Sequence, residues 1–224
     1  MKNKDTAALE MMSYLKNYNK FVLLLMKRYI TEGPILDFGS GLGDFAKQLN
    51  DSGYKCDGVE VDSKCNLESQ KKGIKTFYSL TEVKKLYPTV TSLNVLEHIE
   101  DDVKILNDLF NIIEENGSLV LYLPASMAVW SNMDVEVGHY RRYSKKEIIH
   151  KLHSVGFTVT HSSYKDFGGW LILILFRLFR ITPKFDKNLT IFYDRFIFPF
   201  AKYLDVLGSF FIGKNILLVA KVRK

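Results

Sequence analysis

The sequence lacks a disulfide framework, a long hydrophobic run, an internal repeat and a low-complexity tract. Its two cysteines, Cys56 and Cys65, lie nine residues apart with no recognisable secretory signal, so we expect a reducing, cytoplasmic environment. The apolar runs at 170–176 and 196–201 are far shorter than the roughly 20 residues of a spanning helix. These absences argue against a disulfide framework and against a transmembrane anchor.

The overall composition is that of an ordinary globular protein. Hydrophobic residues make up 47% and charged residues 25% of the 224-residue chain, which excludes wholesale disorder and a multi-spanning membrane protein. We expect one domain over 1–224. Its expected parts are an N-terminal helical segment (1–32), a cofactor-binding core (33–165), a helical insertion or cap (166–212) and a last strand (213–224).

Positive charge is concentrated near the end of the chain. Residues 164–224 carry a net charge of +7, and the rest of the chain carries −1. Apolar runs interleave with these basic residues, which is typical of a helix lying in a membrane interface. A buried helix pair with solvated flanking charges gives the same pattern, so both interpretations stay open for residues 167–212.

Strand and helix patterns alternate along most of the chain. This alternation predicts an α/β fold with a doubly wound, mostly parallel sheet of seven strands, an N-terminal helix and a late helical insertion before the last strand. The expected strands are 34–38, 54–61, 74–78, 91–96, 118–124, 157–164 and 214–222. The expected helices outside the insertion are 5–30, 43–52, 63–72, 101–117 and 144–156.

The stretch "PILDFGSGLGDFAKQL" (34–49) places three glycines between the first strand and its helix. Bare backbone at this position suits a nucleotide-type ligand, and Glu60 at the end of the second strand can accept both hydroxyl protons of a ribose. The dinucleotide fingerprint needs a glycine at 44, where this chain has Asp44. Asp37 within the first strand favours a cationic ligand over a pyrophosphate. S-adenosylmethionine carries the matching charges and a ribose.

Three segments resemble the signature segments of class I S-adenosylmethionine-dependent methyltransferases: "ILDFGSGLGDFAKQL", "GVEVD" and "LNVLEHIEDD". Together with "YNKF", "GHYRRYSKKEI" and "GKNILLVAK", they resemble a bacterial type 11/12-like subgroup. The resemblance implies a Rossmann-like methyltransferase fold and S-adenosyl-L-methionine as cofactor. It places Asp37, Gly39, Ser40 and Gly41 at the methionine end, Glu60 at the ribose, and Asn94, Val95 and Leu96 near the sulfonium. The acid that family members carry after the third strand is missing from "FYSLTEV", which leaves Ser79 or backbone for the adenine.

The segment "WSNMDVEVGHYRRY" (130–143) follows the fifth strand and concentrates aromatic and charged residues at the expected site. We expect substrate contacts from Tyr18, Trp130, Tyr140, Arg141, Arg142 and Tyr143. His139 is the candidate general base because imidazole titrates near neutral pH. An alternative is that His139, Arg142 and Tyr143 lock the loop through Asp134 or backbone.

No metal site is expected, because capping and the helix dipole account for Glu97, Asp101 and Asp102 at a helix start. The leading hypothesis is in-line methyl transfer to a small or lipophilic acceptor, such as a lipid-linked molecule, suggested by the apolar insertion. Two alternatives are an NAD-dependent oxidoreductase and a non-catalytic nucleotide-binding adaptor at a membrane surface. Interleaved apolar runs argue against nucleic acid as a partner. The sequence does not indicate an oligomeric state.

Overall fold

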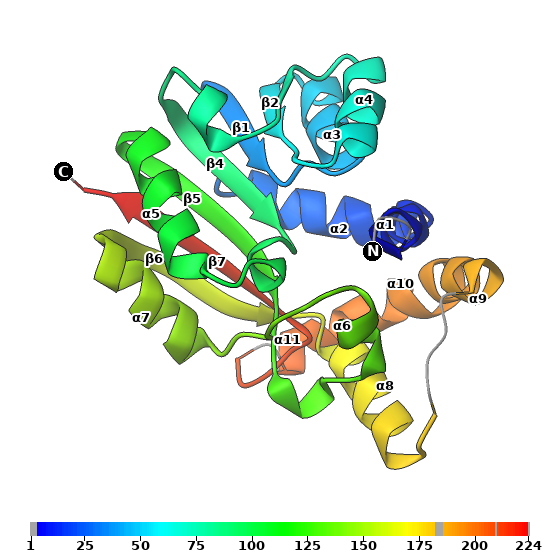
Figure 1. The fold of residues 1–224 in the computed structure, drawn as a ribbon. Coiled ribbons are helices and arrows are strands. Elements are labelled where there is room, and N and C mark those ends of the chain that lie inside the picture. The colour runs from blue at the N-terminus through cyan, green and yellow to red at the C-terminus, as the bar shows by residue number, and fades with distance from the viewer. Residues whose placement is uncertain (1–3, 182–185, 209, 224) are drawn as a thin grey trace.

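One mixed β-sheet forms the centre of the protein (Figure 1). The structure is a computed structural model that describes residues 4–181, 186–208 and 210–223. The strand order is β3-β2-β1-β4-β5-β7-β6. β7 runs antiparallel to β5 and β6, and the other neighbouring strands are parallel. This confirms the predicted mostly parallel α/β sheet. The strands are β1 (Pro34–Phe38), β2 (Lys55–Val59), β3 (Thr76–Phe77), β4 (Tyr87–Leu93), β5 (Ile113–Pro124), β6 (Phe157–Lys165) and β7 (Asn215–Val222).

Helices cover both faces of the sheet. Figure 1 shows α5 (Asp102–Ile112) and α7 (Lys145–Val155) on one side and α1 (Lys4–Ser13) and α2 (Lys16–Lys27) on the other. The remaining helices are α3 (Asp44–Asp51), α4 (Ser63–Lys71), α6 (Asn132–Glu136), α8 (Phe167–Leu178), α9 (Lys187–Phe192), α10 (Phe198–Ala201) and α11 (Asp205–Gly208). None of the helices within the described ranges combines the length and hydropathy needed to cross a bilayer.

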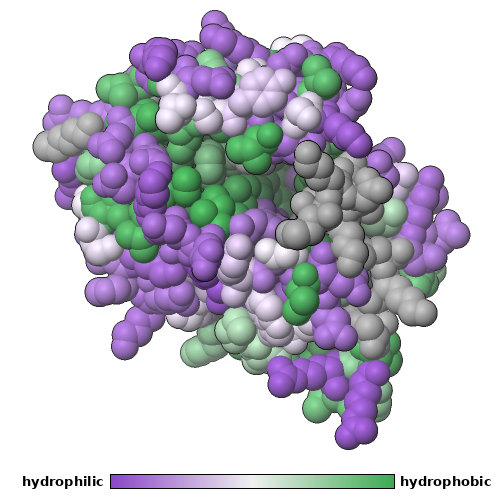
Figure 2. Space-filling model, viewed as in Figure 1, coloured by the Kyte–Doolittle hydropathy of each residue, from purple (hydrophilic) through white to green (hydrophobic). Residues whose placement is uncertain are grey.

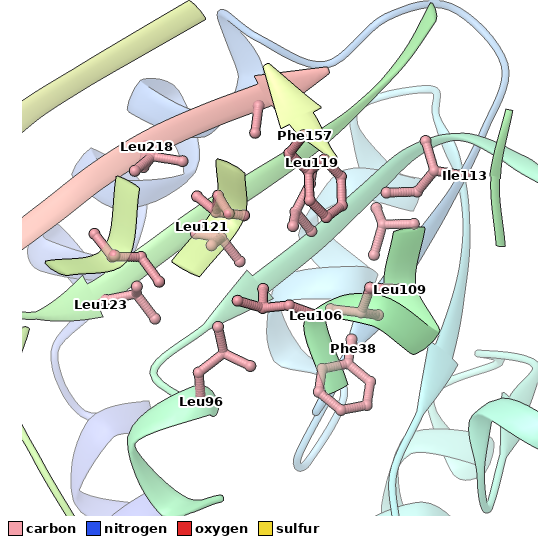
Figure 3. Packing of buried hydrophobic residues seen from close by; sticks show 14 of the residues in the cluster. Phe38, Leu96, Leu106, Leu109, Ile113, Leu119, Leu121, Leu123, Phe157 and Leu218 are labelled. Carbon is pink, nitrogen blue, oxygen red and sulfur yellow. The ribbon is translucent and has the colours of Figure 1, made fainter. Parts of the chain in front are cut away.

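The apolar strand β5 explains how the layers hold together. Successive side chains point to opposite faces of a strand. Leu119, Leu121 and Leu123 pack with residues of α5 and α7 in one buried cluster (Figure 3). Val120 and Tyr122 pack on the opposite face with α2, β7 and Phe198 of α10. The N-terminal helices, the sheet and the insertion therefore share a core.

The predicted helix over 5–30 is wrong as a single element, because the chain turns between α1 and α2 at Tyr14 and Leu15. The reason is a contact from far along the chain. The buried Asp194 accepts the N–H groups of Asn17 (2.8 Å) and Tyr18 (2.9 Å) at the start of α2. A carboxylate at a helix N-terminus satisfies amides that have no partner within the helix. The insertion thus supplies the cap that begins α2.

Two predicted boundaries in the middle of the chain also move. β4 begins at Tyr87 instead of 91 and ends at Leu93, because Asn94 adopts a left-handed φ of 50°. The helix predicted to reach 117 ends at Ile112, because Ile113 pairs with Tyr87 across the sheet. An irregularity in register follows between Tyr87 and Thr89, at the place where Pro88 has no N–H to donate.

Replacing Asp194 with alanine is expected to destabilise the whole fold. The change leaves two backbone N–H groups of α2 without an acceptor, at a cost of about 2 kcal/mol in the free energy of unfolding. This corresponds to a Tm lower by about 4–8 °C for a chain of this size. The control Asp186→Ala removes an exposed cap of α9 and is expected to lower Tm less. Equal losses in the two variants would contradict the long-range cap.

Candidate functional site

The candidate site lies at the carboxyl ends of β1, β2, β4 and β5. β1 and β4 are neighbours in the sheet, although β2 and β3 lie between them in the chain. Such a reversal of strand order is where open α/β sheets bind ligands. Figure 2 shows that the surface is hollowed near the centre of this view, with hydrophobic residues gathered there.

The glycine loop after β1 is pressed against the loop after β4. Gly39 has a φ of 76°, and the Val95 side chain occupies the space that a Cβ at Gly39 would need. The N–H groups of Gly39 and Ser40 both donate to the Val59 carbonyl, at 2.9 and 3.0 Å. A side chain at 39 would therefore push the two loops apart and strain the backbone.

Glu60 joins the ends of β1 and β2. One carboxylate oxygen accepts the Gly41 N–H at 2.8 Å, and the other accepts the Asp62 N–H at 2.8 Å. A carboxylate has about four acceptor positions, so two remain for a pair of ligand hydroxyls. These two hydrogen bonds hold the Glu60 carboxylate against the glycine loop, as the sequence predicts for these two elements of the cofactor site.

Asp37 is the buried acid beneath this loop. It accepts a hydrogen bond from the Thr91 hydroxyl at 2.9 Å. Burial raises the pKa of Asp37 to about 7; the Thr91 bond opposes this rise, and the negative charge of Glu60 adds to it. A carboxyl that is only partly ionised at neutral pH becomes fully ionised when a cation binds beside it.

The predicted residues after β4 lie in different surroundings. Asn94 donates its N–H to the Tyr122 carbonyl, and the Val95 side chain lies against Gly39 of the glycine loop. Leu96 is fully buried in the cluster that contains Phe38 and Leu106 (Figure 3). Its side chain therefore supports the loop from within the core.

Tyr18 is buried on α2 and takes part in a polar chain beneath the site. Its hydroxyl lies 3.1 Å from the Tyr122 hydroxyl and 3.3 Å from Oδ1 of Asn215. The amide of Asn215 in turn donates to Oδ1 of Asn94 at 3.4 Å. Tyr18 therefore reaches the site through Asn215, at the start of β7.

Asp134 organises the loop that follows β5. Its carboxylate accepts from Nδ1 of His139 (2.8 Å) and Nε of Arg142 (2.7 Å), and it completes a capping box with Ser131. Burial tends to raise the pKa of Asp134, but these hydrogen bonds outweigh it and hold the pKa below its usual range. The lock through Asp134 that the sequence suggested for His139 and Arg142 is present.

Asp102 holds the far end of the same loop. It accepts from the Tyr143 hydroxyl (2.8 Å) and pairs with Arg141 (2.8 Å) and Lys151 (2.6 Å). The attribution of these acids to capping and the helix dipole holds in part: Asp101 caps α5, and Asp102 lies in the first turn of α5 but is turned inward to Tyr143. Tyr140 is exposed, Trp130 is half-buried, and Arg141 also donates to the Glu100 carbonyl.

Glu97 is the functional candidate that the sequence interpretation missed. It is fully buried, and neither carboxylate oxygen has a hydrogen-bond partner within the described part of the chain. Burial raises the pKa of Glu97 to about 8, with Arg142 opposing the rise. Oε1 lies 3.8 Å from Nε2 of His139. Glu97 does not cap α5; it lies in the first turn of the 3-10 helix Leu96–His98 with its carboxyl group buried. Its position directly after the expected site residue Leu96 was the available signal.

Ligand atoms of Glu97, His98 and His139 lie within 4.8 Å of one another, so these three residues could hold a cation. The rings of His98 and His139 also stack edge to face, with centroids 4.6 Å apart. The expectation that no metal is used stays a prediction at this site.

Comparison with known proteins identifies the family. The family model described as "Methyltransferase domain" matches residues 11–162. The chain belongs to this methyltransferase family. No curated protein sequence matches the chain.

Solved structures of methyltransferases share the fold. A chain from the complex of the Haloferax volcanii Trm112 methyltransferase activator with a methyltransferase has a TM-score of 0.67 at 13% identity, covering 100% of this chain and 99% of that one. A SAM-dependent methyltransferase from Archaeoglobus fulgidus has a TM-score of 0.59 at 17% identity, with coverages of 91% and 94%. Phosphoethanolamine N-methyltransferase 2 from Haemonchus contortus, solved with S-adenosyl-L-methionine, has a TM-score of 0.60 at 16% identity. That match covers 93% of this chain but only 53% of the Haemonchus chain.

These matches confirm the predicted Rossmann-like methyltransferase fold. The resemblance to class I S-adenosylmethionine-dependent methyltransferases, stated from three segments of sequence, agrees with the family and with the sheet order.

Glu60→Ala is expected to weaken the binding of S-adenosylhomocysteine. The wild-type methyltransferase should bind this product in the micromolar range or tighter, about −8 kcal/mol. Loss of the charge-assisted hydrogen bonds from Glu60 should cost about 1.5–3 kcal/mol, measured by calorimetry. Glu68→Ala on the exposed face of α4 serves as a matched control. If Glu60→Ala bound S-adenosylhomocysteine as tightly as the wild type does, Glu60 would not belong to the binding site.

The same titration is expected to depend on pH through Asp37. A cationic amino group prefers the ionised carboxyl, so affinity falls as pH falls through the pKa of about 7 in the free protein. Between pH 8 and pH 6 the ionised fraction drops from about 90% to about 10%, and affinity should fall about tenfold. Asp37→Asn should bind weakly with a flat profile. A flat profile in the wild type would contradict the assignment.

Proposed function

We propose that this methyltransferase uses S-adenosyl-L-methionine to methylate a small, lipophilic acceptor by in-line transfer. The observation that carries the proposal is the junction of the glycine loop, Glu60 and Asp37 at the switch point of the sheet. A bound S-adenosylmethionine supplies a methyl group already activated by a positively charged sulfur.

The residues at the junction fit that cofactor. Asp37 and Glu60 offer negative charge for an amino group and acceptors for ribose hydroxyls. Ser40 is buried, and its side chain packs against Gly58 of β2, so it supports the glycine loop from beneath. Asp44 stands where a dinucleotide site needs its third glycine, and it pairs with Lys72. The geometry therefore favours this cofactor over NAD.

His139 is the proposed general base. The ionised Asp134 carboxylate accepts a hydrogen bond from the Nδ1–H group of His139. The free lone pair of the neutral imidazole is then on Nε2. That nitrogen can take the proton of an acceptor hydroxyl as its oxygen attacks the methyl carbon. It can also take the proton of an ammonium beforehand, because only the neutral amine has a lone pair for the attack. An acceptor that is already anionic needs orientation only. Arg142 is held by the same carboxylate, so base and guanidinium keep a fixed relation.

A pocket of about 380 Å³ beside the loop supports a lipophilic acceptor. It lies between the loop after β5, the start of α7, the end of β6 and the end of the insertion. Its lining combines apolar and aromatic side chains with Arg142, Ser144 and Glu147. This volume suits a small-molecule ligand. Its lining residues include Ser126, Met127, Arg142, Tyr143, Tyr164, Phe211 and Ile212.

His139→Ala is expected to lower turnover about 100-fold or more, with affinity for S-adenosylhomocysteine unchanged. The assay follows transfer of labelled methyl groups to a panel of lipophilic phenols, carboxylic acids and amines. His153→Ala on the exposed face of α7 is the matched control.

Two outcomes would assign His139 another role. Loss of folding or of cofactor affinity together with activity would make it a structural residue of the loop. Inhibition of the wild type by a chelator, reversed by a divalent cation, would make it a metal-binding residue with Glu97 and His98. The proposed base mechanism requires activity that a chelator does not change.

A further inference from the structure

The second half of the insertion is one uninterrupted helical run. α9, a π-helical turn (Tyr193–Ile197), α10, a 3-10 turn (Lys202–Leu204) and α11 follow one another without a gap from Lys187 to Gly208. One side of the run faces the protein, where Asp194, Phe198, Ala201 and Asp205 recur every three or four residues and are buried. The run is therefore anchored along a single face.

The opposite side of this run is apolar and exposed. It carries Leu189, Phe192, Phe196, Phe200, Tyr203 and Val206, again spaced by three or four residues. The exposed fractions of Phe200, Tyr203 and Val206 are 75%, 66% and 74%. An amphipathic helix normally turns its apolar side inward. Here a second apolar side faces outward, and we call these six residues the outer stripe.

The end of α8 extends the apolar surface. The buried residues of α8, a helix described along its whole length, are Gly168 and Gly169, so its large apolar side chains are half-buried or exposed. Leu178 and Phe179 at its end are both 71% exposed. Figure 2 shows hydrophobic and hydrophilic residues side by side at the tip where α8 ends. Of the two interpretations left open for residues 167–212, a buried helix pair with only charges outside does not agree with these exposed apolar side chains.

Charge is sorted between the inside and the outside of the insertion. Three of its four acids are buried and accept backbone N–H groups: Asp166 from Gly169, Asp194 from α2, and Asp205 from Asp166 and Phe167. Four basic residues of the described part lie toward the outside. Arg195 is exposed and Lys202 half-buried beside Phe196 and Tyr203 of the outer stripe, and Arg177 and Arg180 are exposed at the end of α8. The outward face is thus apolar with a positive rim.

We propose that this face binds the surface of an anionic lipid bilayer. Aromatic and aliphatic side chains enter the interface while the basic rim meets lipid phosphates. A second copy of the chain is a poorer occupant, because its own basic rim would be brought against this one. The inference is independent of the acceptor and of catalysis.

Flotation with vesicles tests the proposal on the full chain. At low ionic strength, about 0.02 M, the wild type should bind vesicles of phosphatidylglycerol mixed with phosphatidylcholine, and far less should bind at about 0.5 M. Phe200→Asp should lower the bound fraction about tenfold or more, and so should Arg195→Gln/Lys202→Gln. Leu67→Asp, at an exposed position on α4, is the matched control and should bind as the wild type does.

The proposal is overturned if no wild-type protein binds vesicles at low ionic strength, or if Phe200→Asp binds vesicles as well as the wild type does. It is also overturned if the wild type is a dimer in solution, Phe200→Asp is a monomer, and neither binds vesicles. Binding of S-adenosylhomocysteine, measured on each variant, reports the folded site separately. A failed proposal about the membrane therefore leaves the proposed methyl transfer untouched, and the reverse also holds.

Discussion

The hydrogen bonds from Gly41 and Asp62 to the Glu60 carboxylate set the geometry on which the candidate cofactor site depends. They fasten the loop after β1 to the end of β2, while the missing side chain of Gly39 lets Val95 close against the same loop from β4. Three strand ends are thereby held at one point. A ligand finds acceptors already oriented, so little conformational entropy is lost when it binds.

Other buried carboxylates also hold together segments that are distant from them in the sequence. Asp134 and Asp102 each gather partners from the loop after β5, so that His139, Arg142 and Tyr143 are fixed at two points. Asp194 and Asp205 do the same for the starts of α2 and α8. Each carboxylate satisfies backbone or side-chain donors that would otherwise be buried without partners. The irregular parts of the fold are thus ordered by charge-assisted hydrogen bonds, whereas the sheet is ordered by apolar packing.

This division explains what the sequence could predict. Strands such as β5, and the glycine loop, are recognisable from a few consecutive residues. The sheet and the expected cofactor positions can therefore be predicted from local sequence pattern and from resemblance. The break between α1 and α2 depends on Asp194, more than 170 residues away, and the inward turn of Asp102 depends on Tyr143. Glu97 looks like an ordinary acid at a helix start until the fold buries it. Contacts between residues far apart in the sequence cannot be predicted from local sequence patterns.

The position of β7 has a consequence for the order in which the chain can fold. This strand follows every other strand in the sequence, yet it lies between β5 and β6 and pairs with both along its length. During synthesis, β5 and β6 emerge without the neighbour that joins them, and each has an unpaired edge until β7 is made. Asn215, which links Tyr18 to Asn94, arrives with the same strand. A chain that stops a dozen residues early therefore lacks both the closed sheet and the polar link beneath the site.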